Sequence, residues 1–113
     1  MTPGKTRTES LKVLRATRRK MISSAWTRKL KRQDKATRRR AADALLNIGA
    51  AIDTIELAKL KSIAIAVEDN EQEIDKGIEN LEKAIESMTR VDSVLTAVEN
   101  LMKLGSRIAP LLV

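Results

Sequence analysis

The sequence predicts an all-α protein in which a basic N-terminal helical arm is followed by an antiparallel helical hairpin or small helix bundle. Apolar residues recur at spacings of three and four along most of the chain, the period of an amphipathic helix. Helix breakers are rare, with four Gly and two Pro among 113 residues. We expect helices over about residues 10–32, 34–67, 71–90 and 92–104.

Charge divides the chain near residue 40. Residues 1–40 hold 15 basic and 2 acidic side chains, a net charge of +13, whereas residues 41–113 hold 7 basic and 13 acidic side chains, a net charge of −6. A chain of 113 residues has room for one small domain. We interpret residues 1–40 as a basic nucleic-acid-binding arm and residues 41–113 as an acidic helical oligomerisation bundle.

The first predicted helix follows an irregular lead at residues 2–4, with Thr8 or Ser10 as its N-cap. Arg18 falls inside its apolar stripe, so we expect a helix that docks on the rest of the protein without being a clean core helix. The stripe consists of Leu11, Leu14, Met21, Ile22, Ala25 and Trp26.

The second predicted helix has a regular apolar stripe, within which Gly49 marks a close contact between helices. Its later apolar residues Leu57, Leu60 and Ile65 lie off that stripe, which indicates a helix packed on two neighbours. A short strand over residues 62–67 is an alternative. The stripe itself consists of Ala41, Ala44, Leu45, Ile48, Ala51, Ile52, Ile55, Ile63 and Ala66.

The third predicted helix follows a reversal at residues 68–71, which indicates a helical hairpin. Its seam of Ile74, Ile78, Leu81, Ile85 and Met88 is followed by a second stripe that is rotated by roughly 100° on a straight helix. Either the seam turns onto a second partner or the helix breaks near Val91. Asp92 as a cap and Gly105 as a stop favour the break. The second stripe consists of Val91, Val94, Leu95, Val98, Leu101 and Met102.

The C-terminal tail, residues 108–113, is apolar around Pro110. We expect it to cover an exposed edge of the bundle or to dock on a neighbouring molecule.

Residue types that the chain lacks argue against enzymatic chemistry. It contains no His and no Cys, which excludes an imidazole base, a thiolate nucleophile and a thiolate metal site. The acidic residues between 68 and 86 lack the central glycine of a calcium loop, so we interpret them as a solubilising surface. We therefore predict no enzymatic activity, no cofactor and no metal. No apolar run is long enough to form a transmembrane segment.

Eight basic residues among positions 28–40 favour binding to a nucleic-acid backbone, DNA or RNA. Arg outnumbers Lys there, which suits forked contacts to phosphate oxygens. Base-reading signatures are missing, so we expect binding that tolerates any sequence. The predicted nucleic-acid-binding residues are Arg15, Arg18, Arg19, Lys20, Arg28, Lys29, Lys31, Arg32, Lys35, Arg38, Arg39 and Arg40.

Self-assembly is predicted because the apolar faces exceed what one hairpin can hide. We expect a homo-oligomer whose interface is formed by Leu57, Leu60, Val94, Val98 and Leu101. A basic arm followed by an aliphatic bundle is similar in layout to nucleoid proteins and to the coat proteins of some filamentous DNA viruses. This resemblance implies a protein that packages or coats nucleic acid, in the cytoplasm, in a nucleoid or within a virion.

Other interpretations remain open. The arm could be a solvated basic face, or it could be attracted to the protein's own acidic half. It could also bind an acidic protein, which would make the chain an interaction adaptor, or the acidic half of another copy, which would give rings or filaments. The helix from Leu11 to Trp26 could lie on an anionic membrane surface. Residues 1–33 are also Arg-rich and nearly free of acids, as in an organellar transit peptide.

Overall fold

The computed structural model describes residues 2–68, 71–88 and 90–108, and all regular secondary structure in these ranges is α-helical. The chain thus has the all-α fold that its apolar periodicity predicts. The helices are α1 (Pro3–Met21), α2 (Ser24–Lys31), α3 (Lys35–Leu57), α4 (Leu60–Val67), α5 (Glu71–Ser87) and α6 (Val91–Ile108).

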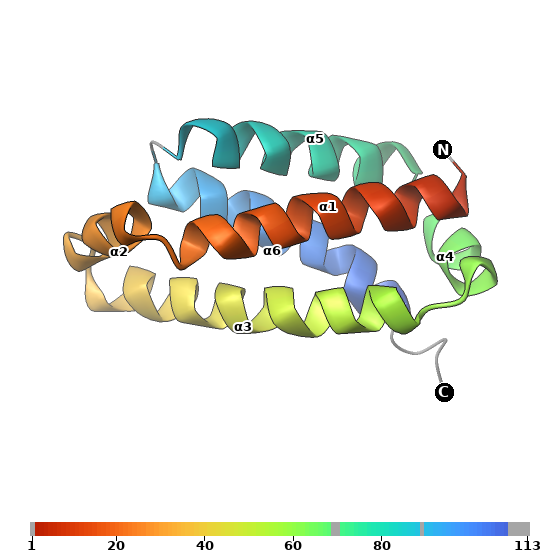
Figure 1. The fold of residues 1–113 in the computed structure, drawn as a ribbon, viewed down its shortest axis with the longest axis horizontal. Coiled ribbons are helices and arrows are strands. Elements are labelled where there is room, and N and C mark those ends of the chain that lie inside the picture. Colours follow the sequence, from red (N-terminus) through yellow and green to blue (C-terminus); the bar gives the residue numbers. More distant parts are fainter. Residues whose placement is uncertain (1, 69–70, 89, 109–113) are drawn as a thin grey trace.

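Four long helices form the body of the molecule, which measures 43 × 26 × 20 Å (Figure 1). Helices α1 and α5 run in one direction along its length, and α3 and α6 run in the opposite direction. The two short helices, α2 and α4, lie at opposite ends of this bundle and connect α1 to α3 and α3 to α5. One end therefore brings together α2, the start of α3 and the start of α6.

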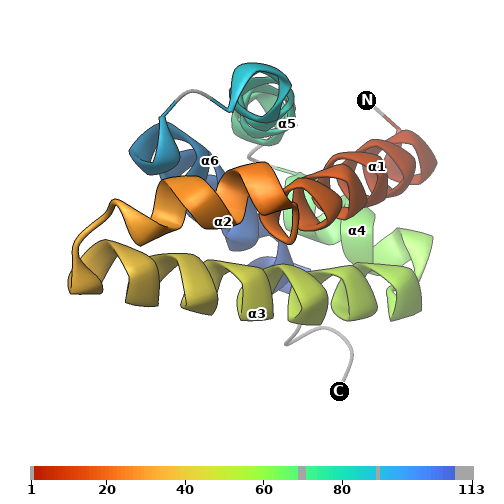
Figure 2. The same ribbon diagram turned by 60° about the vertical axis from the view of Figure 1, so that its left-hand side comes forward.

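The pairs of helices that pack together differ from the predicted hairpin. Helix α6 makes the most extensive contacts, with α3 on one side and α5 on the other, while α1 packs on α3, α4 and α5. Helices α3 and α5 lie on opposite sides of the molecule (Figure 2). The antiparallel hairpin is therefore formed by α5 and α6, and α1 completes the bundle.

Helix α1 begins seven residues earlier than predicted. Thr2 is its N-cap, with the Thr2 hydroxyl accepting from the Lys5 amide at 3.2 Å, and Pro3 occupies the first helical position. Pro is favoured there because its missing N–H has no partner in the first turn. The expected irregular lead is therefore wrong, since Thr2-Pro3-Gly4 is a helix start. The predicted N-cap at Thr8 or Ser10 is also wrong, because both residues lie inside α1.

The first predicted helix is interrupted at residues 22–23. The Ser23 hydroxyl donates to the Lys20 carbonyl at 2.6 Å and accepts from the Trp26 amide at 3.3 Å, so Ser23 caps α2. This break removes Ile22 and Ala25 from the predicted stripe, and both side chains are exposed. Ser competes with helix continuation by such bonds, which explains an interruption without Gly or Pro.

The second predicted helix is interrupted at Ala58, whose backbone is extended. The break turns α4 across the end of the bundle, where Ile63 is fully buried. The off-stripe residues Leu57, Leu60 and Ile65 mark this break and are exposed, so the expectation that one continuous helix packs on two neighbours is wrong. Residues 62–67 are helical, which excludes the alternative strand.

The break predicted near Val91 is present. Helix α5 ends at Ser87, and Met88 has a left-handed backbone with φ of 48°. Helix α6 begins at Val91 with Asp92 in its first turn, so Asp92 does not occupy the predicted cap position. The predicted stop at Gly105 is also wrong, because α6 continues to Ile108. The predicted tail began at Ile108, which is the last residue of α6, and its remaining residues, 109–113, lie outside the described ranges.

One hydrophobic core runs through all six helices. Its seams on α5 and α6 are the predicted ones, and the first 40 residues add Val13, Leu14 and Trp26, each at most 2% exposed. Apart from the neighbouring backbone of α3, no atom lies within 4 Å of the position that a Cβ on Gly49 would take, so the close contact predicted there is wrong. The charge boundary near residue 40 therefore lies within a single packed core.

Small polar residues let α1 enter this core. Thr6, Ser10 and Thr17 are at most 1% exposed and share a face with Val13 and Leu14. Thr17 satisfies its hydroxyl by donating to the Val13 carbonyl at 2.7 Å. Such bonds to the carbonyl four residues earlier allow a hydroxyl to be buried without another partner.

Candidate nucleic-acid interface

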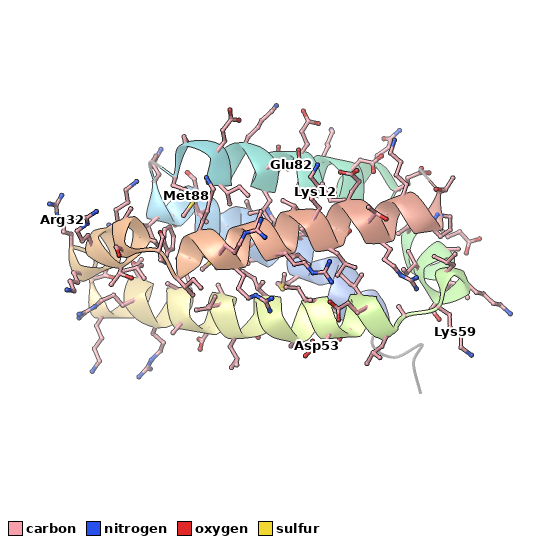
Figure 3. The ribbon with its side chains drawn as sticks, in the orientation of Figure 1. Lys12, Arg32, Asp53, Lys59, Glu82 and Met88 are labelled. Carbon is pink, nitrogen blue, oxygen red and sulfur yellow. The ribbon has the colours of Figure 1, made fainter. Side chains whose placement is uncertain are left out.

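Residues 24–40 form a strongly basic end of the molecule, called here the basic end. It comprises α2, the turn at residues 32–34 and the first turns of α3. Arg32 lies at this end and Lys59 at the opposite one (Figure 3). Eight basic residues and one acidic residue, Asp34, give the basic end a net charge of +7.

Two caps and one buried anchor hold the basic end in helical form against the repulsion of its charges. Trp26 is 2% exposed and fixes α2 to the core, and Ser23 caps that helix. Asp34 caps α3 by accepting from the Thr37 amide at 2.7 Å. The hydrogen bonds from Thr37 lower the pKa of the Asp34 carboxyl, because they favour the charged form.

Most predicted binding residues are exposed and available. In the part of the chain that the structure describes, eight of the twelve form no side-chain hydrogen bond or ion pair with another residue. Arg18, which falls within the predicted stripe, is exposed because α1 turns a different face to the core. The eight are Arg18, Arg19, Arg28, Lys31, Arg32, Lys35, Arg38 and Arg39.

Arg40 is bound by the acidic part of the chain. Its Nη1 lies 2.7 Å from Oδ1 of Asp92, its Nη2 donates to the Thr96 hydroxyl at 3.0 Å, and its Nε donates to Glu99. The hydrogen bonds to Glu99 and then to Asp92 raise the pKa of Arg40. All three partners are on α6, so this guanidinium connects α3 to α6.

Three further predicted residues are engaged within the molecule. Lys20 donates to the carbonyl of Ile85 at 2.8 Å, and Lys29 donates to the carbonyl of Met88. Both lysines thus bind the C-terminal end of α5, where free carbonyls favour cations. Arg15 pairs with Glu56 of α3. These residues join elements of the bundle, which reduces their availability to a partner.

Arg90 joins the basic end from the acidic part of the chain. It lines a surface hollow of about 460 Å³ together with Lys29 and Arg32 of the basic end. The remaining lining residues are Gln33, Val91 and Asp92. Sequence reasoning missed Arg90 because its nearest charged neighbours in the sequence are acidic. Only the packing of the α5–α6 connection beside α2 brings it to this surface.

The predicted oligomer interface is divided by the fold. Val94 and Val98 are fully buried and Leu101 is 3% exposed, so these three residues belong to the core of the single chain. Assigning them to an interface between copies was wrong, because α3, α4 and α5 of the same chain pack on α6. Leu57 and Leu60 remain exposed beside the break between α3 and α4.

Four of the six residues in the predicted stripe between Leu11 and Trp26 face the core rather than a membrane surface. The buried residues are Leu11, Leu14, Met21 and Trp26, whereas the large apolar side chain of Ile22 is exposed. Among the described residues, no helix is long and apolar enough to cross a bilayer. The same residues contain no group of three or more carboxylates positioned to hold a metal ion.

Comparison with protein-family models finds no matching family, and searches of curated proteins and of solved structures find no match to this chain.

Proposed function

We propose that the protein binds the phosphate backbone of nucleic acid through its basic end, without reading sequence. The observation that carries this proposal is the concentration of exposed cations without intramolecular partners at one end of the bundle. Six of them lie within residues 28–39, on α2, on the first turns of α3 and at Arg32 between these helices. Arg90 adds a seventh from the other part of the chain.

The size of the basic end fits such a ligand. The two shorter dimensions of the molecule are 26 and 20 Å. A duplex carries one phosphate charge per about 1.7 Å of its axis, so a 20 Å stretch carries about 12 charges on all its sides. Seven cations are comparable with the phosphates on one side of such a stretch.

A duplex suits this surface better than a single strand. Proteins that bind single strands without sequence preference stack the bases on exposed aromatic side chains. Trp26 is the single aromatic residue of the chain, and it is 2% exposed. The surface therefore offers charge without a stacking platform, and we expect a duplex to bind more tightly than a single strand of the same length.

An acidic protein partner is the competing function, because the same cations would attract carboxylates. Geometry favours the phosphate backbone, since four of the six unpartnered cations within residues 28–39 are Arg, whose planar fork matches phosphate oxygens.

The packaging role that the layout of the chain implies would need copies to associate as well. The remaining candidates for that contact are Leu57 and Leu60, which are 76% and 48% exposed.

A pair of matched double variants tests the proposal. Arg38→Gln/Arg39→Gln removes two exposed charges from the basic end, and Lys59→Gln/Lys61→Gln removes two exposed charges from the opposite end. We expect the first variant to weaken binding of a labelled duplex at least about tenfold at low salt, because two phosphate contacts are lost. The second variant should bind nearly as the parent does. Equal losses in the two variants would contradict a localised interface.

A further inference from the structure

We propose that the hollow lined by Lys29, Arg32 and Arg90 binds a phosphate monoester, the group that ends a phosphorylated nucleic-acid strand. This inference rests on the proposed function for the source of the ligand, and it adds a site and a ligand class within the basic end. The hollow has a volume of about 460 Å³, which accommodates a phosphate group together with bound water.

Three cations converge on the hollow from two distant parts of the sequence. Lys29 is on α2, Arg32 follows that helix, and Arg90 precedes α6. The packing of α1 on α5, fixed by the Lys20–Ile85 contact, aligns the two parts. Cations near one another repel, so an anion between them relieves an unfavourable arrangement.

Lys29 is held in place before any ligand arrives. Its ammonium donates to the carbonyl of Met88, whose left-handed backbone ends α5. An ammonium has three N–H donors, so two remain for phosphate oxygens. A donor whose position is fixed loses less side-chain entropy on binding than a free surface lysine does.

The charge around the hollow indicates a doubly charged ligand. Asp92 is the acidic residue of the lining, and its carboxylate is bound by Arg40, which also binds Glu99. The positive charges in and beside the hollow are those of Lys29, Arg32, Arg40 and Arg90, and the negative charges are those of Asp92 and Glu99, which makes four positive and two negative charges. The excess of two matches a phosphate monoester, which carries about −1.5 to −2 at neutral pH. An internal phosphodiester carries one negative charge.

The test compares a blunt duplex carrying 5′-phosphates with the same duplex carrying 5′-hydroxyls. We expect the phosphorylated duplex to bind about tenfold more tightly at low salt, as for hydrogen bonds to a charged group. Arg90→Gln should abolish this difference. Arg39→Gln removes the same charge outside the hollow, so it should weaken both duplexes and leave their ratio unchanged.

Inorganic phosphate separates a strand end from free phosphate as the source of the ligand. Titration at constant ionic strength, followed by the amide NMR signals of Gln33 and Val91, should show saturable shifts that Arg90→Gln removes. Saturable phosphate binding with equal affinity for the two duplexes would assign the hollow to free phosphate. Equal affinity for both duplexes without saturable phosphate binding would overturn the proposal and leave the proposed function standing. Binding of phosphate without binding of either duplex would overturn the proposed function alone.

Discussion

Arg40, the last basic residue of the positively charged segment, forms an ion pair with Asp92 of α6, with 2.7 Å between Nη1 and Oδ1. The chain's two oppositely charged parts are therefore in direct contact within one molecule. At Arg40, the attraction between the oppositely charged parts stabilises the fold. The neighbouring Arg38 and Arg39 are exposed. Adjacent arginines thus have different roles.

Arg40→Gln should lower the free energy of unfolding and have little effect on the affinity for nucleic acid. The substitution removes an ion-pair network with Asp92 and Glu99 whose side chains are partly exposed, so we expect a loss of about 1 kcal/mol in the free energy of unfolding. Urea denaturation measures this loss. Arg39→Gln is the matched control, with an expected loss of binding and unchanged stability. The opposite pattern in the two variants would contradict the division of roles.

Leu101→Ala distinguishes a core residue from an interface residue. Leu101 is 3% exposed within one chain, so its truncation should lower the free energy of unfolding by about 2–5 kcal/mol. Because the lost contacts are intramolecular, the loss should be the same at all protein concentrations. Denaturation at low and high concentration checks this. A loss in the free energy of unfolding that disappears on dilution would show that Leu101 lies at an interface between copies.

Gly49→Ala should stabilise the protein. Gly49 lies inside α3, and a Cβ there would meet no atom within 4 Å apart from the neighbouring backbone of the helix itself. Ala restricts the unfolded chain and favours the helix, so we expect a gain of about 0.5–1 kcal/mol. Thermal unfolding measures the change. A destabilised variant would show that the space beside Gly49 is filled in solution.

Asp34 should make the start of α3 sensitive to acid. The pKa of its carboxyl is lowered by the hydrogen bonds from Thr37, so the folded protein binds this proton less readily than the unfolded chain. The contribution to stability is complete above the unfolded value of about 4 and is lost as the pH falls through the lower folded value. Asp34→Asn retains an N-cap that does not titrate and should lose less stability between about pH 5 and 2. Identical pH profiles would contradict this role.

The apolar pattern of the sequence predicts the core well where one helix keeps one stripe. Ile48, Ile52 and Ile55 on α3, and Leu81 and Leu95 on α5 and α6, are buried as their spacing requires. The two unpredicted breaks follow from local polar bonds and packing instead. The first predicted helix is interrupted at Ser23, whose hydroxyl forms hydrogen bonds with the backbone. The second is interrupted at Ala58, and this break allows Ile63 to pack over the end of the bundle.

The candidate interface is predictable from sequence only in its composition. Eight of the predicted basic residues form no side-chain hydrogen bond or ion pair among the described residues. No local pattern separates Arg39 from Arg40, because the partners of Arg40 lie at least 52 positions away. The same holds for Lys29 and Arg90, whose roles depend on how α5 ends beside α2. Charge density identifies the region, and tertiary contacts assign each cation its role.

The dependence of duplex affinity on salt tests most directly whether the basic end binds a phosphate backbone. With six or more phosphate contacts, the association constant should fall by roughly 10³ between about 50 and 200 mM salt, and the logarithmic slope should become shallower by about one for each of Arg38 and Arg39 removed. An association constant that stays unchanged from about 50 to about 500 mM salt would contradict backbone binding by these cations.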